Sequence, residues 1–165
     1  MGSIQDQAER DAEGIRSRAW GDSIPVDPVR IAKALGVETF ESQLDPNVSA
    51  VLSKRAERDP IIILNRNDSP SRQRFSCAHE LGHFVRLSNS GRVGTDFEYI
   101  EYRGPLARQG KDDEEMYANA FAGNLLMPRK YVLAFQKDDL SVVDQALKFE
   151  VSTDALETRL RVLGL

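Results

Sequence analysis

Apolar residues recur along this chain at two spacings, one typical of helices and one typical of strands. Helical spacing dominates the N-terminal stretch, where apolar residues recur among charges: Ile4, Ala8, Ala12, Ile15 and Ala19. A second helix is predicted from Pro28 to Gly36, because Asp27 can cap it, proline suits a first turn and glycine ends many helices. Both helices are predicted to be scaffold.

Three runs rich in β-branched or apolar residues predict strands, at 37–40, 48–53 and 60–65. The last two are expected to form a hairpin that turns at 55–59. The stretch from Ser90 to Gly110 contains glycines and scattered charges without a clear period, and it is predicted to be a loop. We therefore expect an α+β protein with a small three-stranded sheet packed on helices.

The longest predicted helix begins at Ser69, a capping serine followed by a proline, and ends near Gly91. It contains the sequence HELGH, from His79 to His83. Residues four apart share a helix face, so these two imidazoles can bind one cation. Zinc suits imidazole nitrogen and lowers the pKa of a water that it binds, and Glu80 lies where it can act as general base on that water. The alternative is an ordinary pair of histidines on an amphipathic helix.

A catalytic zinc ion needs three protein ligands and one open position. The chain has two histidines, both in this motif, and its single cysteine, Cys77, lies about 200° round the helix from His79. A carboxylate must therefore complete the site. The densest acidic cluster opens a helix predicted from 112 to 127, and spacing does not choose among its four members: Asp112, Asp113, Glu114 and Glu115.

Three further residues are candidates for supporting roles. Asn119 shares a helix face with Glu115 and can orient a neighbouring group. Tyr99 and Tyr102 can donate a hydrogen bond to a developing oxyanion, although each can equally be an ordinary surface or core residue.

Composition narrows the class of protein. The chain has 165 residues and a net charge of −4, which argues against broad binding to nucleic acid or to anionic membranes. A single cysteine excludes an internal disulfide and fits a reducing compartment. The N-terminus lacks an apolar core typical of a signal peptide, and no apolar run approaches the roughly 20 residues of a membrane span. We expect a cytoplasmic protein.

The C-terminal part, from 128 to 165, is predicted to be helical and to pack on the domain that contains the HELGH motif and spans 1–127. Helices are expected near 131–135, 141–149 and 153–163, and the last two resemble a helix-turn-helix. Between residues 138 and 165, acidic side chains outnumber basic ones by three. This balance favours packing or substrate docking over direct DNA binding.

Two stretches together, FSCAHELGHF (75–84) and EMYANAFAGNLLMP (115–128), resemble the ImmA/IrrE family of metallopeptidases, a gluzincin-like group. The resemblance implies a zincin-like fold in which His79, His83 and Glu115 hold Zn²⁺, or another divalent ion such as Mn²⁺, and Glu80 is the general base. Members of this family typically cleave a helix-turn-helix repressor encoded nearby, which relieves repression of a mobile element or a stress response. Larger members carry a sensor domain after the helical part, and we expect none in this chain, which ends at Leu165.

Two functions follow from the resemblance. The first is a zinc-dependent endopeptidase that cleaves such a repressor. The second is a zinc-stabilised protein that sequesters a repressor or antitoxin partner without cleaving it.

Overall fold

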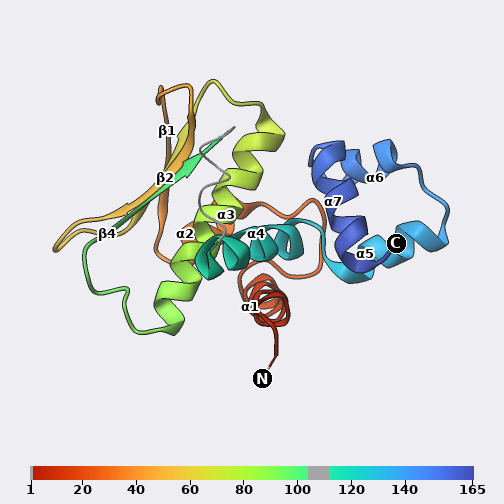
Figure 1. Ribbon diagram of the computed structural model, residues 1–165, viewed down its shortest axis with the longest axis horizontal. Coiled ribbons are helices and arrows are strands. Elements are labelled where there is room, and N and C mark those ends of the chain that lie inside the picture. The colour runs from red at the N-terminus through yellow and green to blue at the C-terminus, as the bar shows by residue number, and fades with distance from the viewer. Residues whose placement is uncertain (1, 104–111) are drawn as a thin grey trace.

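The described part of the chain, residues 2–103 and 112–165 of a computed structural model, contains seven helices and four strands. The fold is α+β (Figure 1): the sheet lies at one end, α3 and α4 cross in the middle, and α5 to α7 gather at the other end. The α+β prediction is therefore confirmed.

The sheet contains four strands in the order β1-β3-β2-β4. Strand β1 (Glu38–Ser42) pairs parallel with β3 (Ile61–Asn65), and β2 (Val48–Lys54) pairs antiparallel with both β3 and β4. The predicted hairpin between β2 and β3 is present. The predicted number of three strands is wrong, because β4 (Phe97–Tyr102) lies in the stretch that was expected to be a loop.

The inverted alternation of β4 explains why its sequence did not indicate a strand. Glu101 is buried, while Ile100 and Tyr102 are 37% and 40% exposed. In the second half of β4 a charged residue therefore faces inward and apolar residues face outward, which is the reverse of the pattern that predicts a half-buried strand. Residues 90–96 of the predicted loop lie outside helices and strands, as expected, and residues 104–110 lie outside the described residues.

The two N-terminal helices form where they were predicted. Helix α1 spans Ile4–Ala19, and helix α2 spans Pro28–Ala34 after its cap, Asp27, whose side chain accepts hydrogen bonds from two backbone amides. Helix α1 buries its alanine-rich face against α4, with Ala8 and Ala12 fully buried.

Helix α3 (Pro70–Asn89) is the central element of the core. Its first turn is capped by Ser69 as expected, and the ten residues 76–85 are all buried. One side of α3 contacts β2 and β3, and another side crosses α4 (Asp113–Leu126). Apolar residues that line both contacts form one continuous core, which places the motif helix in the least exposed part of the protein.

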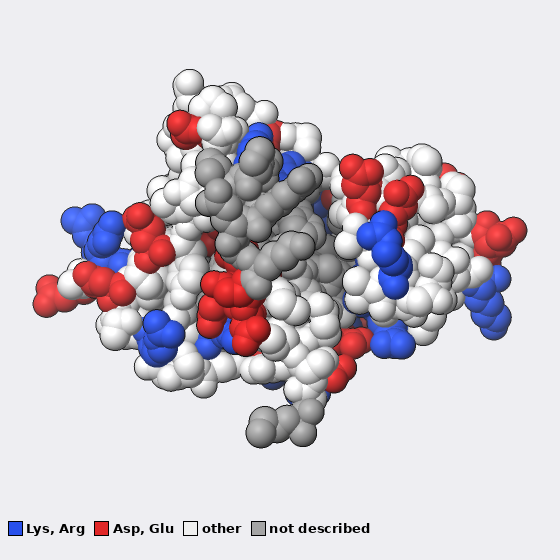
Figure 2. All heavy atoms as spheres, in the orientation of Figure 1, with Lys and Arg blue, Asp and Glu red and all other residues white. Residues whose placement is uncertain are grey.

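Three short helices follow: α5 (Arg129–Lys137), α6 (Val142–Phe149) and α7 (Thr153–Leu163). Ser141 and Ser152 cap the last two, and Gly164 ends α7 in a left-handed conformation. The predicted boundary at 127/128 falls between α4 and α5, and the division into two domains stays a prediction. Acidic and basic side chains are interspersed over these helices on the face that Figure 2 shows. Among the described residues, no helix is both long and apolar enough to cross a membrane.

Candidate metal centre

The motif residues lie on a fully buried turn of α3. His79, Glu80 and His83 have exposed fractions of 2%, 0% and 1%. Histidine and glutamate are rarely buried to this extent without partners, so the surroundings of these three side chains decide what the turn can do.

A close helix crossing brings the second half of the site to this turn. A Cβ atom placed on Gly82 would lie 3.0 Å from the Cα atom of Ala118 and 3.2 Å from Cβ of Phe121. Only glycine fits at this point of α3, and the small residue at 118 allows the approach from α4. The crossing therefore sets the position of Glu115, one turn before Ala118, relative to the two histidines.

The side chains of three candidate ligands converge where α3 and α4 cross. His79 Nε2 lies 3.3 Å from Glu115 Oε2, and His83 Nε2 lies 3.1 Å from Glu115 Oε1. The two imidazole Nε2 atoms are 3.2 Å apart. Among the described residues, these three form the group of histidine, cysteine and acidic side chains that could hold a metal ion.

The spacing of these atoms fits a small divalent cation. Tetrahedral zinc with ligands at about 2.0–2.1 Å places its ligand atoms about 3.3 Å apart. The two imidazole nitrogens are 3.2 Å apart, and each lies 3.1–3.3 Å from one of the two carboxylate oxygens of Glu115. Two imidazole nitrogens and one carboxylate are also the chemistry that catalytic zinc sites use, with a fourth position left open. The residues present therefore fit a metal ion.

Charge in this cluster is balanced between the imidazoles and one carboxylate. Burial would raise the pKa of Glu115, but its contacts with His79 and His83 hold it well below its usual range. Burial opposes the charged form of His79, yet contact with Glu115 and the nearby charges of Glu101 and Glu80 raise its pKa to about 9. Burial lowers the pKa of His83 and outweighs the contact with Glu115. The cluster thus favours one positive charge beside Glu115, and a bound cation would supply that charge instead.

Glu80 is buried beside the cluster without a partner of its own. Among the described residues, no group donates a hydrogen bond to either of its carboxylate oxygens. Burial raises the pKa of Glu80 well above its usual range, and the charges of Glu101 and Glu115 act in the same direction. These effects outweigh the charge of His79, which acts in the opposite direction. A carboxylate with a raised pKa is a stronger base, which suits a general base.

Two of the three candidate supporting residues contact the motif histidines. Asn119 Oδ1 lies 3.0 Å from His79 Nδ1, which fixes the ring so that Nε2 faces Glu115. The ring of Tyr99 stacks on that of His83, with centroids 4.4 Å apart. Tyr102 lies three residues further along β4, on the opposite face, and the structure does not bring it to the site.

The four acidic residues that open α4 have different partners. Asp112 caps the helix by accepting a hydrogen bond from the backbone N–H of Glu115, and Glu114 pairs with Arg86 at 3.1 Å. The backbone carbonyl of Asp113 also accepts from Arg86. Glu115 is the member that faces the histidines, in agreement with the residue that the family resemblance implied.

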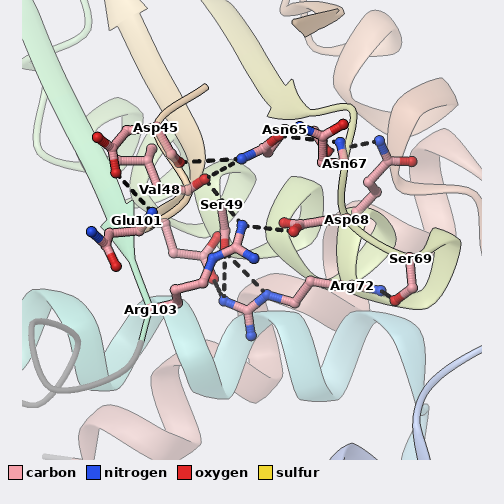
Figure 3. Close-up of polar contacts among 12 residues, drawn as sticks. Asp45, Val48, Ser49, Asn65, Asn67, Asp68, Ser69, Arg72, Glu101 and Arg103 are labelled. Carbon is pink, nitrogen blue, oxygen red and sulfur yellow. Dashed lines mark hydrogen bonds and ion pairs between the residues drawn. The ribbon is translucent and has the colours of Figure 1, made fainter. Parts of the chain in front are cut away.

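Sequence reasoning missed a polar network on the same side of α3 (Figure 3). Arg72 donates to Glu101 Oε1 at 2.6 Å and to Ser49 Oγ, and Arg103 pairs with Asp68 at 2.6 Å. Asp68 and Glu101 are nearly fully buried. The network joins β2 and β4 to the start of α3. In the sequence, the one sign of it was the acidic residue Glu101 among the apolar residues of 97–102.

The family comparison extends over most of the chain. The family model for the IrrE N-terminal-like domain, Peptidase M78, matches residues 32–161. No curated protein matches the chain. Among solved structures, a Mycobacterium tuberculosis transcriptional regulator is similar at 18% identity with a TM-score of 0.62. The similar region covers 97% of this chain and 47% of that chain, so the present chain spans about half the length of that structure, and the likeness concerns the fold.

Proposed function

Because this chain belongs to the Peptidase M78 (IrrE N-terminal-like) family, we propose that it is a metal-dependent endopeptidase whose substrate is a helix-turn-helix repressor. The observation that carries the proposal is the convergence of His79, His83 and Glu115 beside a buried carboxylate without a hydrogen-bond partner among the described residues. A structural zinc site would need a fourth protein ligand and no such carboxylate.

The three ligand residues would hold the metal ion together. His79 and His83 would hold the ion through Nε2, and Glu115 would hold it through its carboxylate. A divalent ion bound there would polarise the scissile carbonyl and lower the pKa of the attacking water. Asn119 keeps His79 in the tautomer and orientation that the ligand role needs.

Glu80 would move the proton. It takes a proton from the water that attacks the peptide carbonyl and delivers it to the leaving amine nitrogen. Its burial suits this task, since a carboxylate with a raised pKa is a stronger base than an exposed one.

A polypeptide substrate has a place to bind beside the site. Strand β4 lies at the edge of the sheet, and its Tyr99 contacts His83. An extended segment can pair with such an edge through backbone hydrogen bonds, which are independent of side-chain identity. The similar structure from Mycobacterium tuberculosis is named a transcriptional regulator, which agrees with a regulatory role for proteins of this fold.

The test compares wild type and Glu80→Gln. The protein is purified without chelator, its zinc content is measured, and it is incubated with a helix-turn-helix repressor encoded near its gene. We expect wild type to cut the repressor and Glu80→Gln to retain zinc but to cut at least about 100-fold more slowly. Glu157→Gln, the same change at an exposed glutamate of α7, serves as the control and should cut at the wild-type rate.

The sequestering function predicts a different pattern. In that case Glu80→Gln would still release repression, whereas His83→Ala would not, because the metal and not the proton transfer would matter. Equal cleavage by wild type and Glu80→Gln would exclude the mechanism proposed above.

A further inference from the structure

A groove of about 760 Å³ lies beside the metal centre, with α3 and α4 on one side and α7 on the other. This volume is in the range of sites that enclose ligands. Much of its wall is apolar: Phe75, Met116, Ala120, Met127, Ala155 and Val162. Phe75 and Ala120 are only partly buried by the core, so the groove exposes apolar surface that a bound chain could cover.

The groove adjoins the metal centre through one residue. Asn119 lines it and also contacts His79. Arg72 lines its other end, on α3 and seven residues before His79, which is about 10 Å along a helix axis. An extended peptide advances about 3.3 Å per residue, so the groove reaches roughly three residues away from the point of cleavage.

One buried cation in the groove wall lacks an acidic partner. Arg159 is 5% exposed, and its Nε donates to the carbonyl oxygen of Met127 at 3.2 Å. No acceptor among the described residues lies within hydrogen-bond distance of Nη2. The nearby Glu9 faces Arg129, at 3.7 Å. Burial lowers the pKa of Arg159 to about 10, so the side chain is a cation at neutral pH.

The other arginine of the groove differs in this respect. Arg72 already pairs with Glu101 and Ser49, so its guanidinium is engaged by the protein itself. A buried guanidinium without a carboxylate is costly, so a ligand carboxylate that pairs with it binds favourably. Asp154 also lines the groove, but among the described residues no ion pair joins it to Arg159. Of the two arginines of the groove, Arg159 is therefore the one suited to recognise an anion.

Resting on the proposed peptidase function, we propose that the groove binds the substrate polypeptide on one side of the scissile bond and that Arg159 selects an acidic side chain flanked by apolar residues. The apolar wall accommodates the flanking side chains, and the guanidinium donates charge-assisted hydrogen bonds to the carboxylate. Specificity then follows from the penalty on any peptide that leaves the cation unpaired.

The experiment measures binding separately from cleavage. An array of short peptides is prepared in which one position at a time is fixed as Glu or as Gln and the others are random. Binding is measured to zinc-loaded Glu80→Gln protein, which holds substrate without turning it over. We expect peptides with Glu at one position to bind about tenfold more tightly than their Gln counterparts. The preference should disappear when Arg159→Gln is added and persist when Arg161→Gln, an exposed arginine of the same helix, is added instead.

The outcomes separate the two proposals. Equal binding of Glu and Gln peptides overturns the role of Arg159, even if wild type cleaves peptides. This comparison changes the peptide and not the protein, so it is independent of any effect on folding. A Glu preference that survives Arg159→Gln, in protein whose thermal melt is unchanged, overturns it as well. A Glu preference that depends on Arg159, in a wild-type protein that cleaves none of the peptides, supports the groove and contradicts the peptidase function.

Discussion

At the start of α3, Arg72 and Arg74 each donate to several acceptors, whereas two turns further along the same helix Glu80 has no donor among the described residues. Arg74 reaches the backbone carbonyls of Val26 and Phe149, and so joins three distant segments. Buried polar groups are normally paired, so unpaired ones require a reason. The first end of α3 holds the fold together, and the second is arranged for partners that do not belong to the chain: a metal ion, a water and a substrate.

The largest expected effect is on zinc binding at the motif turn of α3. Replacing Glu115 by alanine should lower the affinity for Zn²⁺ by more than about 100-fold, because a ligand is lost. Asn119→Ala, which only orients His79, should lower it by about 10- to 100-fold. Affinity is measured by competition with a chromogenic chelator. Asp113→Ala, on the same helical turn, is the control and should bind zinc as wild type does; equal losses at 113 and 115 would contradict the assignment of the ligand.

The next largest effect is on stability, through the buried polar network beside the start of α3. Arg103→Ala should lower the free energy of unfolding by about 2–3 kcal/mol, because it leaves Asp68, which is 3% exposed, as a buried charge without its cation. The Arg55–Glu98 pair is exposed on both sides, so Arg55→Ala should cost less than about 1 kcal/mol. Urea unfolding of both variants gives the comparison. Similar costs for the two would mean that the buried network contributes no more than a surface pair.

How much the sequence could predict differs between these two regions. The motif residues His79, Glu80 and His83 were predictable because their relation is local. Residues four apart on a helix share a face in any fold. For the third ligand, the sequence left four acidic residues open, and only the family resemblance selected Glu115. The position of this ligand depends on a crossing of two helices, which spacing along the chain does not encode. Gly82 and Ala118 determine that crossing, and although both lie within the stretches that carry the resemblance, spacing along the chain does not show that they meet.

The polar network was not predictable for a related reason. Glu101 is buried only because Arg72 lies opposite, 29 residues earlier in the chain. Without that partner in view, the sequence FEYIEY presents a charge at an inward position, and the strand that it forms was taken for a loop. Secondary structure was otherwise predicted well where local signals were strong, as at the caps Asp27, Ser69 and Ser152.

A smaller effect tests the crossing on which the metal centre depends. Gly82→Ala should destabilise the protein by about 2 kcal/mol, because the added methyl group meets backbone of α4 at 3.0 Å. It should also weaken zinc binding, since α4 must shift and Glu115 with it. Gly14→Ala on α1 meets only the end of the flexible Arg18 side chain, and should be neutral or stabilising by up to about 1 kcal/mol. Thermal melts and zinc titrations of both variants distinguish a specific clash from a general effect of alanine.

The smallest expected effect comes from making the same substitution, glutamate to glutamine, at Glu80 and at Glu101. Glu80 and Glu101 are both buried glutamates, but Glu101 has Arg72 at 2.6 Å and Glu80 has no hydrogen-bond donor among the described residues. In metal-free protein, Glu80→Gln should raise the free energy of unfolding by about 1 kcal/mol, because a neutral amide costs less to bury than an unpaired carboxyl group. Glu101→Gln should lower it by a similar amount, because the hydrogen bond from Arg72 loses its charge. Urea unfolding in the presence of a chelator measures both signs. If both variants were destabilised, Glu80 would have a stabilising partner in the folded protein, and the contrast between the two ends of α3 would fail at the residue on which the proposed chemistry most depends.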